Sequence, residues 1–139
     1  MRTAELEMNS GAMTPTKAIG PAALTWTGVI HTLYGVVAYG ATLAEIVGDG
    51  VFNAIGSDSG PGRDAALWFL ATGVLLIVLG RMARWAQRST GTLPSFLGWS
   101  VVGLALVIGV LNPASGWPLV AVSGALLLAA RRPIRANGH

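Results

Sequence analysis

The apolar segment at residues 21–47 most constrains the fold of this chain. The 27 residues between Lys17 and Glu45 include no Asp, Glu, Lys or Arg. About 20 predominantly apolar residues are enough to cross the ~30 Å hydrocarbon core of a bilayer as a helix. The segment therefore predicts a transmembrane helix, and helix tilt absorbs its extra length.

The composition favours a membrane protein over a soluble domain. Of the 139 residues, 53% are hydrophobic and 11% are charged, whereas charged residues make up about 25% of soluble domains. So few charged side chains cannot cover a soluble surface, but lipid solvates an apolar exterior. The chain has no cysteine, which excludes disulfides, thiolate metal sites and cysteine catalysis.

Three further apolar segments follow, and Gly, Ser, Asp and Pro mark the turns between them. We predict spans at about residues 65–85, 94–111 and 117–130. The second span is short unless Arg81 and Arg84 extend their side chains to the headgroups. The last span is also short, and Ser115 is its candidate N-cap. The predicted fold is all-α, a closed up-down bundle of four transmembrane helices.

The basic residues predict the orientation of these spans. With four spans, eight of the nine Lys and Arg residues fall on the side that holds both chain ends, and only Arg63 falls on the other. Basic residues concentrate on the cytoplasmic side of membrane proteins. We therefore expect a multi-pass protein of the cytoplasmic membrane with two cytoplasmic tails, at residues 1–20 and 133–139, and a membrane domain at 21–132. The tryptophans support the same orientation, because tryptophan is enriched at both membrane–water interfaces. Trp26, Trp85 and Trp99 fall near the inner interface, and Trp68 and Trp117 fall near the outer one.

One face of the first span is lined by small and polar residues. At helical spacing this face holds Gly28, His31, Gly35, Ala38, Thr42 and Glu45. Small residues let membrane helices approach closely, so we expect His31 and Glu45 to point into the bundle. Fourteen residues at 1.5 Å each separate the two by about 21 Å, so they do not form one site.

Two interpretations of His31 remain open. It is either a neutral imidazole bonded to a neighbouring helix, or a group that binds a proton or a ligand, because ionisable residues inside a membrane are functional candidates. The candidate ligand-binding face comprises His31, Tyr34, Thr42 and Glu45. Glu45 is either a carboxylate that is solvated at a helix end or paired with Arg63 in the outer loop, or the outer gate of a polar path toward His31. No metal site is predicted, because the only other histidine is His139.

The arginines at the ends of the second and fourth spans are candidate contacts for lipid headgroups. They are Arg81, Arg84 and Arg88, followed by Arg131 and Arg132. Nucleic acid is not an expected partner, because these arginines adjoin the membrane with no folded basic domain beyond it. No hydrolase elbow, phosphate loop, dinucleotide fingerprint or metalloprotease motif is present. We expect no catalytic residues and no cofactor, and membrane lipids as partners, with a homo-oligomer or a membrane complex as further assemblies.

Four sequence blocks carry a family resemblance: GVIHTLYG, RDAALWFLATG, LPSFLGW and LNPASGW. Over about residues 24–130 the chain resembles a family of small four-span bacterial membrane proteins of uncharacterised function. The resemblance implies a four-helix fold but brings no known activity. It also implies that His31, Trp68, Phe69, Pro94 and the turn at 113–116 recur among members of the family. More loosely, the chain is similar to DoxX-type four-helix membrane proteins, for which a redox or quinone link is suggested; the lack of cysteine weakens a thiol-based version.

Two functions therefore compete at the level of sequence. The first is a structural or accessory membrane protein that acts through helix packing. The alternative is a binder or carrier of a small lipophilic ligand or proton that uses the His31 face. The sequence offers least support for an enzyme. Whether His31 is enclosed by side chains or faces a cavity distinguishes the first two.

Overall fold

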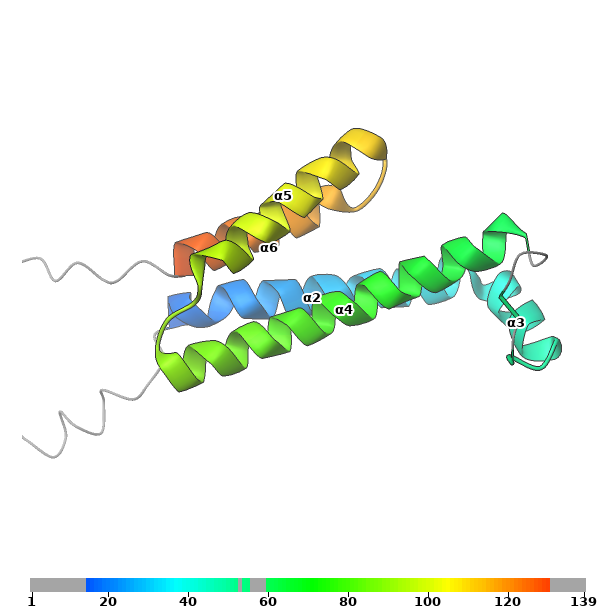
Figure 1. The fold of residues 1–139 in the computed structure, drawn as a ribbon, viewed down its shortest axis with the longest axis horizontal. Helices are drawn as coiled ribbons and strands as arrows, with labels where there is room; N and C mark the ends of the chain where they lie inside the picture. Colours follow the sequence, from blue (N-terminus) through cyan, green and yellow to red (C-terminus); the bar gives the residue numbers. More distant parts are fainter. Residues whose placement is uncertain (1–14, 53, 56–59, 131–139) are drawn as a thin grey trace, which may run out of the picture.

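The computed structural model describes residues 15–52, 54–55 and 60–130, and this part of the chain is all-helical (Figure 1). A long first helix is followed at once by a short one, and then by three more that run back and forth. The helices are α2 (Pro15–Ala38), α3 (Gly40–Gly48), α4 (Pro61–Thr90), α5 (Ser95–Leu111) and α6 (Trp117–Ala130).

Helix α2 is the central element of the described fold. It packs along α4 on one side and along α6 on another, whereas α5 packs closely only against α6. No Cα atom of α4 lies within 8 Å of a Cα atom of α5. A closed four-helix bundle, as predicted from the sequence, has four contacts between neighbouring helices. The described helices lack one of them, the contact between α4 and α5. In Figure 1 the α5–α6 hairpin diverges from α2 and α4 toward its tip.

Glycines allow α2 and α4 to approach each other at backbone distance. A Cβ atom built on Gly28 would lie 2.7 Å from the carbonyl oxygen of Gly73 and 2.7 Å from the backbone nitrogen of Ile77. Likewise, a Cβ atom on Gly80 would overlap the Thr25 side chain. Close backbone approach of this kind is how membrane helices gain packing energy. Gly28, which belongs to the small and polar face predicted for the first span, thus lies in the helix–helix contact.

The predicted first span, 21–47, is not one continuous helix. The chain breaks at Tyr39, which has φ −104° and ψ 16°, and α3 leaves the direction of α2 by 70°. Gly40 follows the break and is a poor helix former. The Tyr39 ring packs against Phe69 of α4, with the ring centroids 5.6 Å apart, which holds the chain where it bends.

The other helix ends also differ from the predictions in places. Helix α2 begins at Pro15, inside the predicted N-terminal tail; residues 1–14 of that tail and the whole tail at 133–139 lie outside the described residues. Helix α4 continues to Thr90 and ends at Gly91, which adopts the left-handed conformation (φ 74°) that favours glycine. Ser115 is not a cap, because its Oγ has no hydrogen-bond partner among the described residues.

Length and composition separate the helices into two groups. Within the described chain, α4 alone is long and apolar enough to cross a membrane, and α2 and α3 pass the same test only as a bent pair. Helices α5 and α6 are apolar but shorter, at 17 and 14 residues, or about 25 and 21 Å.

The buried core lies toward the end of the fold where α2 begins and α6 ends. Leu24, Ala83, Val101, Leu127 and Ala130 are all at most 6% exposed and belong to one cluster. Large apolar side chains are strongly exposed along the described helices at both ends of the fold, for example Val37 at 82%, Val110 at 81% and Trp85 at 69%. The described helices therefore share a small buried core and present many of their large apolar side chains outward.

Candidate functional site

His31 bridges α2 and α4 near the middle of the fold. Its Nε2 atom donates a hydrogen bond to the carbonyl oxygen of Phe69, 3.2 Å away. The imidazole also stacks on the Phe69 ring, with centroids 3.9 Å apart and an angle of 11° between the ring planes. Because a carbonyl oxygen only accepts, this hydrogen bond assigns the proton to Nε2.

Phe69 is the centre of a cluster of four rings. Besides His31 and Tyr39, Tyr34 tilts toward it with the ring centroids 6.1 Å apart. Three of the rings come from α2 and the residue after it, and Phe69 comes from α4. Aromatic pairs in such tilted or offset arrangements contribute energy beyond the area they bury. The cluster therefore positions His31 as well as joining two helices.

A partly open cleft of about 510 Å³ lies beside this cluster. Its walls come from α2, α4, the end of α5, the turn after α5 and the start of α6. Apolar and aromatic side chains dominate, including Ile30, Phe69, Leu76, Trp117 and Leu119. The polar residues among the lining are His31, Tyr34, Tyr39, Thr27, Thr72, Asn112 and Ser115. Ligand sites commonly combine such an apolar wall with a few polar groups and fall in this size range.

Two of the lining hydroxyl groups are already engaged. Thr27 and Ser123 bond to each other across α2 and α6 at 3.0 Å, and Ser123 donates to the carbonyl oxygen of Leu119. Thr27 is therefore the donor in the first bond. Thr72 donates to the carbonyl oxygen of Trp68 in its own helix.

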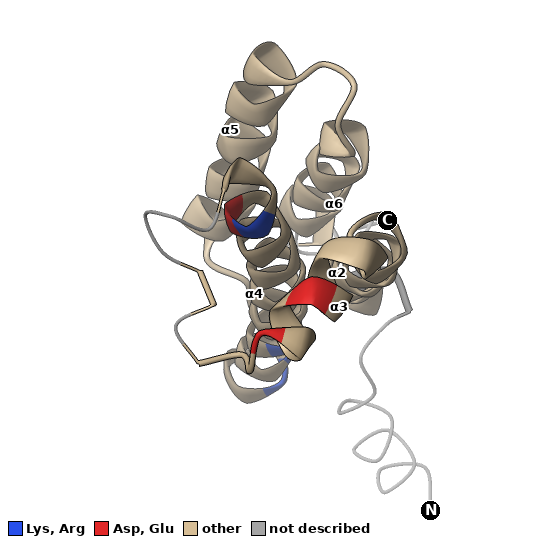
Figure 2. Cartoon of the chain, turned by 90° about the vertical axis from the view of Figure 1, so that its right-hand side faces the viewer, with Lys and Arg blue, Asp and Glu red and all other residues tan. Residues whose placement is uncertain are grey.

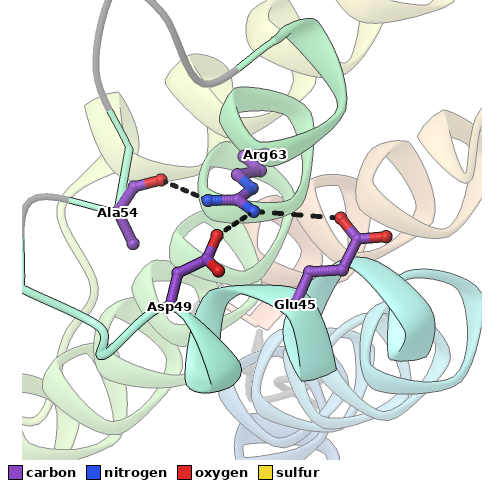
Figure 3. Close-up of polar contacts among 4 residues, drawn as sticks. All are labelled: Glu45, Asp49, Ala54 and Arg63. Atoms are coloured by element: carbon purple, nitrogen blue, oxygen red, sulfur yellow. Dashed lines mark hydrogen bonds and ion pairs between the residues drawn. The ribbon is translucent and has the colours of Figure 1, made fainter.

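The predicted outer part of the polar face does not reach the cleft. Thr42 and Glu45 lie on α3, beyond the break, and neither lines the cleft. Figure 3 shows the Arg63 guanidinium contacting the carboxylates of Glu45 (4.0 Å) and Asp49, and donating to the Ala54 carbonyl oxygen at 3.1 Å. Of the two interpretations of Glu45, this geometry matches the pair with Arg63 and provides no path to His31.

The candidate headgroup arginines on α4 follow the part of the helix that lines the cleft, and none of them is among the lining residues. Arg81, Arg84 and Arg88 are exposed toward the C-terminal end of α4. Viewed along the helices, charged residues appear on and just after α3 and toward the two ends of α4 (Figure 2), and Lys17 lies in the first turn of α2. Arg131 and Arg132 lie outside the described residues.

The cleft offers little to a metal ion. No group of three or more His, Asp or Glu side chains that could hold one exists among the described residues. What the site offers is an apolar pocket, stacked rings and a few uncharged hydrogen-bonding groups. Apolar pockets with a few polar groups are typical of ligand-binding sites, and the described lining of this one includes no carboxylate.

Several residues of the site were missed from the sequence. Tyr39 and Asn112 were not candidates, and Trp117 was placed in an outer tryptophan belt. Trp117 packs on Gly109 of α5, where an added Cβ atom would lie 2.7 Å from the indole ring. A signal existed in the Gly109–Trp117 spacing across a five-residue turn, since a bare glycine opposite a large ring is a typical packing pair.

The profile of one protein family matches residues 14–134, which is most of the chain. The chain belongs to DUF6463, a family of unknown function. The resemblance to an uncharacterised family is confirmed to that extent. No curated protein matches the chain significantly, and no solved structure does.

The contribution of His31 to stability is separable into two parts. His31→Phe keeps a ring on Phe69 but removes the hydrogen bond, so we expect the free energy of unfolding to fall by about 1 kcal/mol. His31→Ala also removes the stack and should cost roughly 1 kcal/mol more. Unfolding in detergent measures both, with the exposed Leu33→Ala as control. A His31→Phe variant as stable as wild type would show that the hydrogen bond contributes nothing.

Proposed function

We propose that this chain is a multi-pass protein of the cytoplasmic membrane, with four membrane-embedded helices and both termini in the cytoplasm. The apolar helices, their exposed large side chains and the eight-to-one distribution of basic residues support this topology. In this topology Arg81, Arg84 and Arg88 face the cytoplasmic headgroups, and Arg63 lies on the outer side.

The α5–α6 hairpin is recessed below the outer surface in this topology. Its helices are shorter than the ~30 Å of hydrocarbon, and its turn shares the cleft with Phe69 and Thr72, halfway along the uncharged stretch 65–80 of α4. Non-helical backbone at membrane depth is tolerated where it is buried in protein or lines a water-filled cavity. The turn at 112–116 lines the cleft, and in this topology the cleft admits water from the outer side.

Single cysteines test this topology, because the chain has none of its own. In intact spheroplasts a membrane-impermeant maleimide should label Gly62→Cys quickly and Ala114→Cys more slowly, because position 114 is recessed. Thr92→Cys, at the opposite end of α4, should be labelled only after permeabilisation. Labelling of Thr92→Cys in intact cells would refute the orientation, and labelling of Ala114→Cys only from the inside would refute the outward hairpin.

Within this topology, we propose that the protein binds a small lipophilic molecule in the cleft beside His31. One observation carries this proposal. His31 lines an apolar cleft that is large enough for a small ligand, and neighbouring side chains cover it only in part. His31 acts there as a positioned ring on Phe69 that keeps the wall of the cleft in place.

An accessory function through helix packing is the second candidate. The backbone contact of α2 with α4, made through Gly28, Gly73 and Gly80, favours it. That contact, however, serves the fold itself and leaves the cleft without a role. The binding function accounts for both features, because a rigid pair of helices gives the cleft a fixed wall.

A pair of tryptophan substitutions on α6 tests ligand binding. Leu119 lines the cleft and Val122 does not, although the two side chains are similarly exposed, at 52% and 57%. Leu119→Trp should fill the cleft and displace a bound molecule, whereas Val122→Trp should leave it in place. Native mass spectrometry of protein extracted from its own membrane measures the retained mass.

The expected result is an added mass in wild type and Val122→Trp that is lost in Leu119→Trp, with all three proteins equally folded. Wild-type protein without any bound molecule would contradict the binding function and leave the accessory function. An identical mass on Leu119→Trp and Val122→Trp would place the ligand outside the cleft.

A further inference from the structure

We infer that the molecule bound in the cleft is an uncharged amphiphile, with a lipid-soluble body and at least one hydroxyl or carbonyl oxygen. This inference rests on the proposed binding function and adds the chemical class of the ligand. Three features of the cleft carry it: the absence of charge in its wall, the hydrogen-bonding groups that remain unpaired, and its depth beside α4.

The described wall of the cleft contains no Asp, Glu, Lys or Arg. The guanidinium of Arg63 on the outer side is already held by Asp49 and the Ala54 carbonyl oxygen. A phosphate, carboxylate or ammonium group in the cleft would lose its hydration without gaining a counter-ion, which is strongly unfavourable. The wall therefore selects against charged lipids and charged metabolites.

Four lining residues retain hydrogen-bonding capacity, namely Tyr34, Tyr39, Asn112 and Ser115, whose buried Oγ has no partner among the described residues. The Tyr34 hydroxyl, on α2, and the Asn112 side-chain amide, at the end of α5, make no hydrogen bond to another residue in the described ranges. The Thr27, Thr72 and His31 Nε2 protons are already donated, as described above. Tyr34 and Asn112 both donate and accept, which suits a hydroxyl or carbonyl oxygen of a ligand.

The position of the cleft indicates that the ligand enters from the bilayer. The cleft adjoins residues 69–76 of α4, within the uncharged stretch 65–80. On the side where α4 and α5 do not approach each other, no helix–helix contact closes it. Leu119 and Ile30, which are 52% and 54% exposed, are apolar lining residues that a lipid-soluble molecule can pass.

Three photoreactive probes with one alkyl chain and different heads test the inference. Each carries a diazirine in the chain, and the heads are a hydroxyl, a sulfonate and a trimethylammonium group, so two are permanently charged. The full chain is placed in phosphatidylcholine nanodiscs and irradiated with each probe. Peptide mapping then measures labelling of residues 27–39 and 108–120 that excess unlabelled alkyl alcohol suppresses.

We expect the alcohol probe to give suppressible labelling of these segments, and the charged probes to give at least about tenfold less, because of the cost of burying an unpaired charge. Tyr34→Phe and Asn112→Leu should each weaken apparent binding of the alcohol about fivefold, the effect of losing one hydrogen bond. Ser100→Ala, which removes an exposed hydroxyl of α5 outside the cleft, should change nothing.

The outcomes separate this inference from the binding function on which it rests. A sulfonate or trimethylammonium probe that labels the cleft as strongly as the alcohol would overturn the uncharged class and leave binding intact. Unchanged labelling in both Tyr34→Phe and Asn112→Leu would overturn the hydrogen-bonding head. If none of the three probes gives suppressible labelling, the proposed binding function fails together with the inference.

Discussion

The close approach of α2 to α4 is the contact on which the rest of the described structure depends. Gly28 and Gly73 bring two backbones together where any side chain would separate them. That approach brings the His31 ring onto Phe69 and within reach of its carbonyl oxygen. The same helix α2 then holds α6 through Thr27 and Ser123. Without the glycine contact, neither the ring cluster nor the wall of the cleft would have a fixed position.

The cleft follows from a mismatch in length between the two helix pairs. Helix α4 has 30 residues, whereas α5 and α6 have 17 and 14. The shorter hairpin packs on α2 at the end that holds the core and diverges toward its tip (Figure 1). The tip therefore ends beside Phe69 and Thr72 instead of reaching α3. In the proposed membrane topology, a cavity at this depth is accessible to lipid-soluble molecules.

Local sequence patterns predicted the helices better than they predicted the site. Apolar length and turn residues placed α5 and α6 closely, and the small and polar face of the first span includes Gly28, which lies in the α2–α4 contact. The 70° break at Tyr39 was missed, because residues 40–48 continue the apolar pattern and the bend depends on packing against Phe69 and on Arg63. The partner of His31 was missed as well, since a backbone carbonyl has no sequence signal. Assigning Thr42 and Glu45 to the His31 face assumed a straight helix.

The most direct test of the central claim is a crystal structure grown from a lipidic mesophase, using protein extracted from its own membrane. The account predicts electron density for an uncharged molecule between the Phe69 ring and the turn at 112–116, with His31 still bonded to the Phe69 carbonyl oxygen. A structure in which the α5–α6 hairpin packs against α4 and side chains fill the cleft would contradict it.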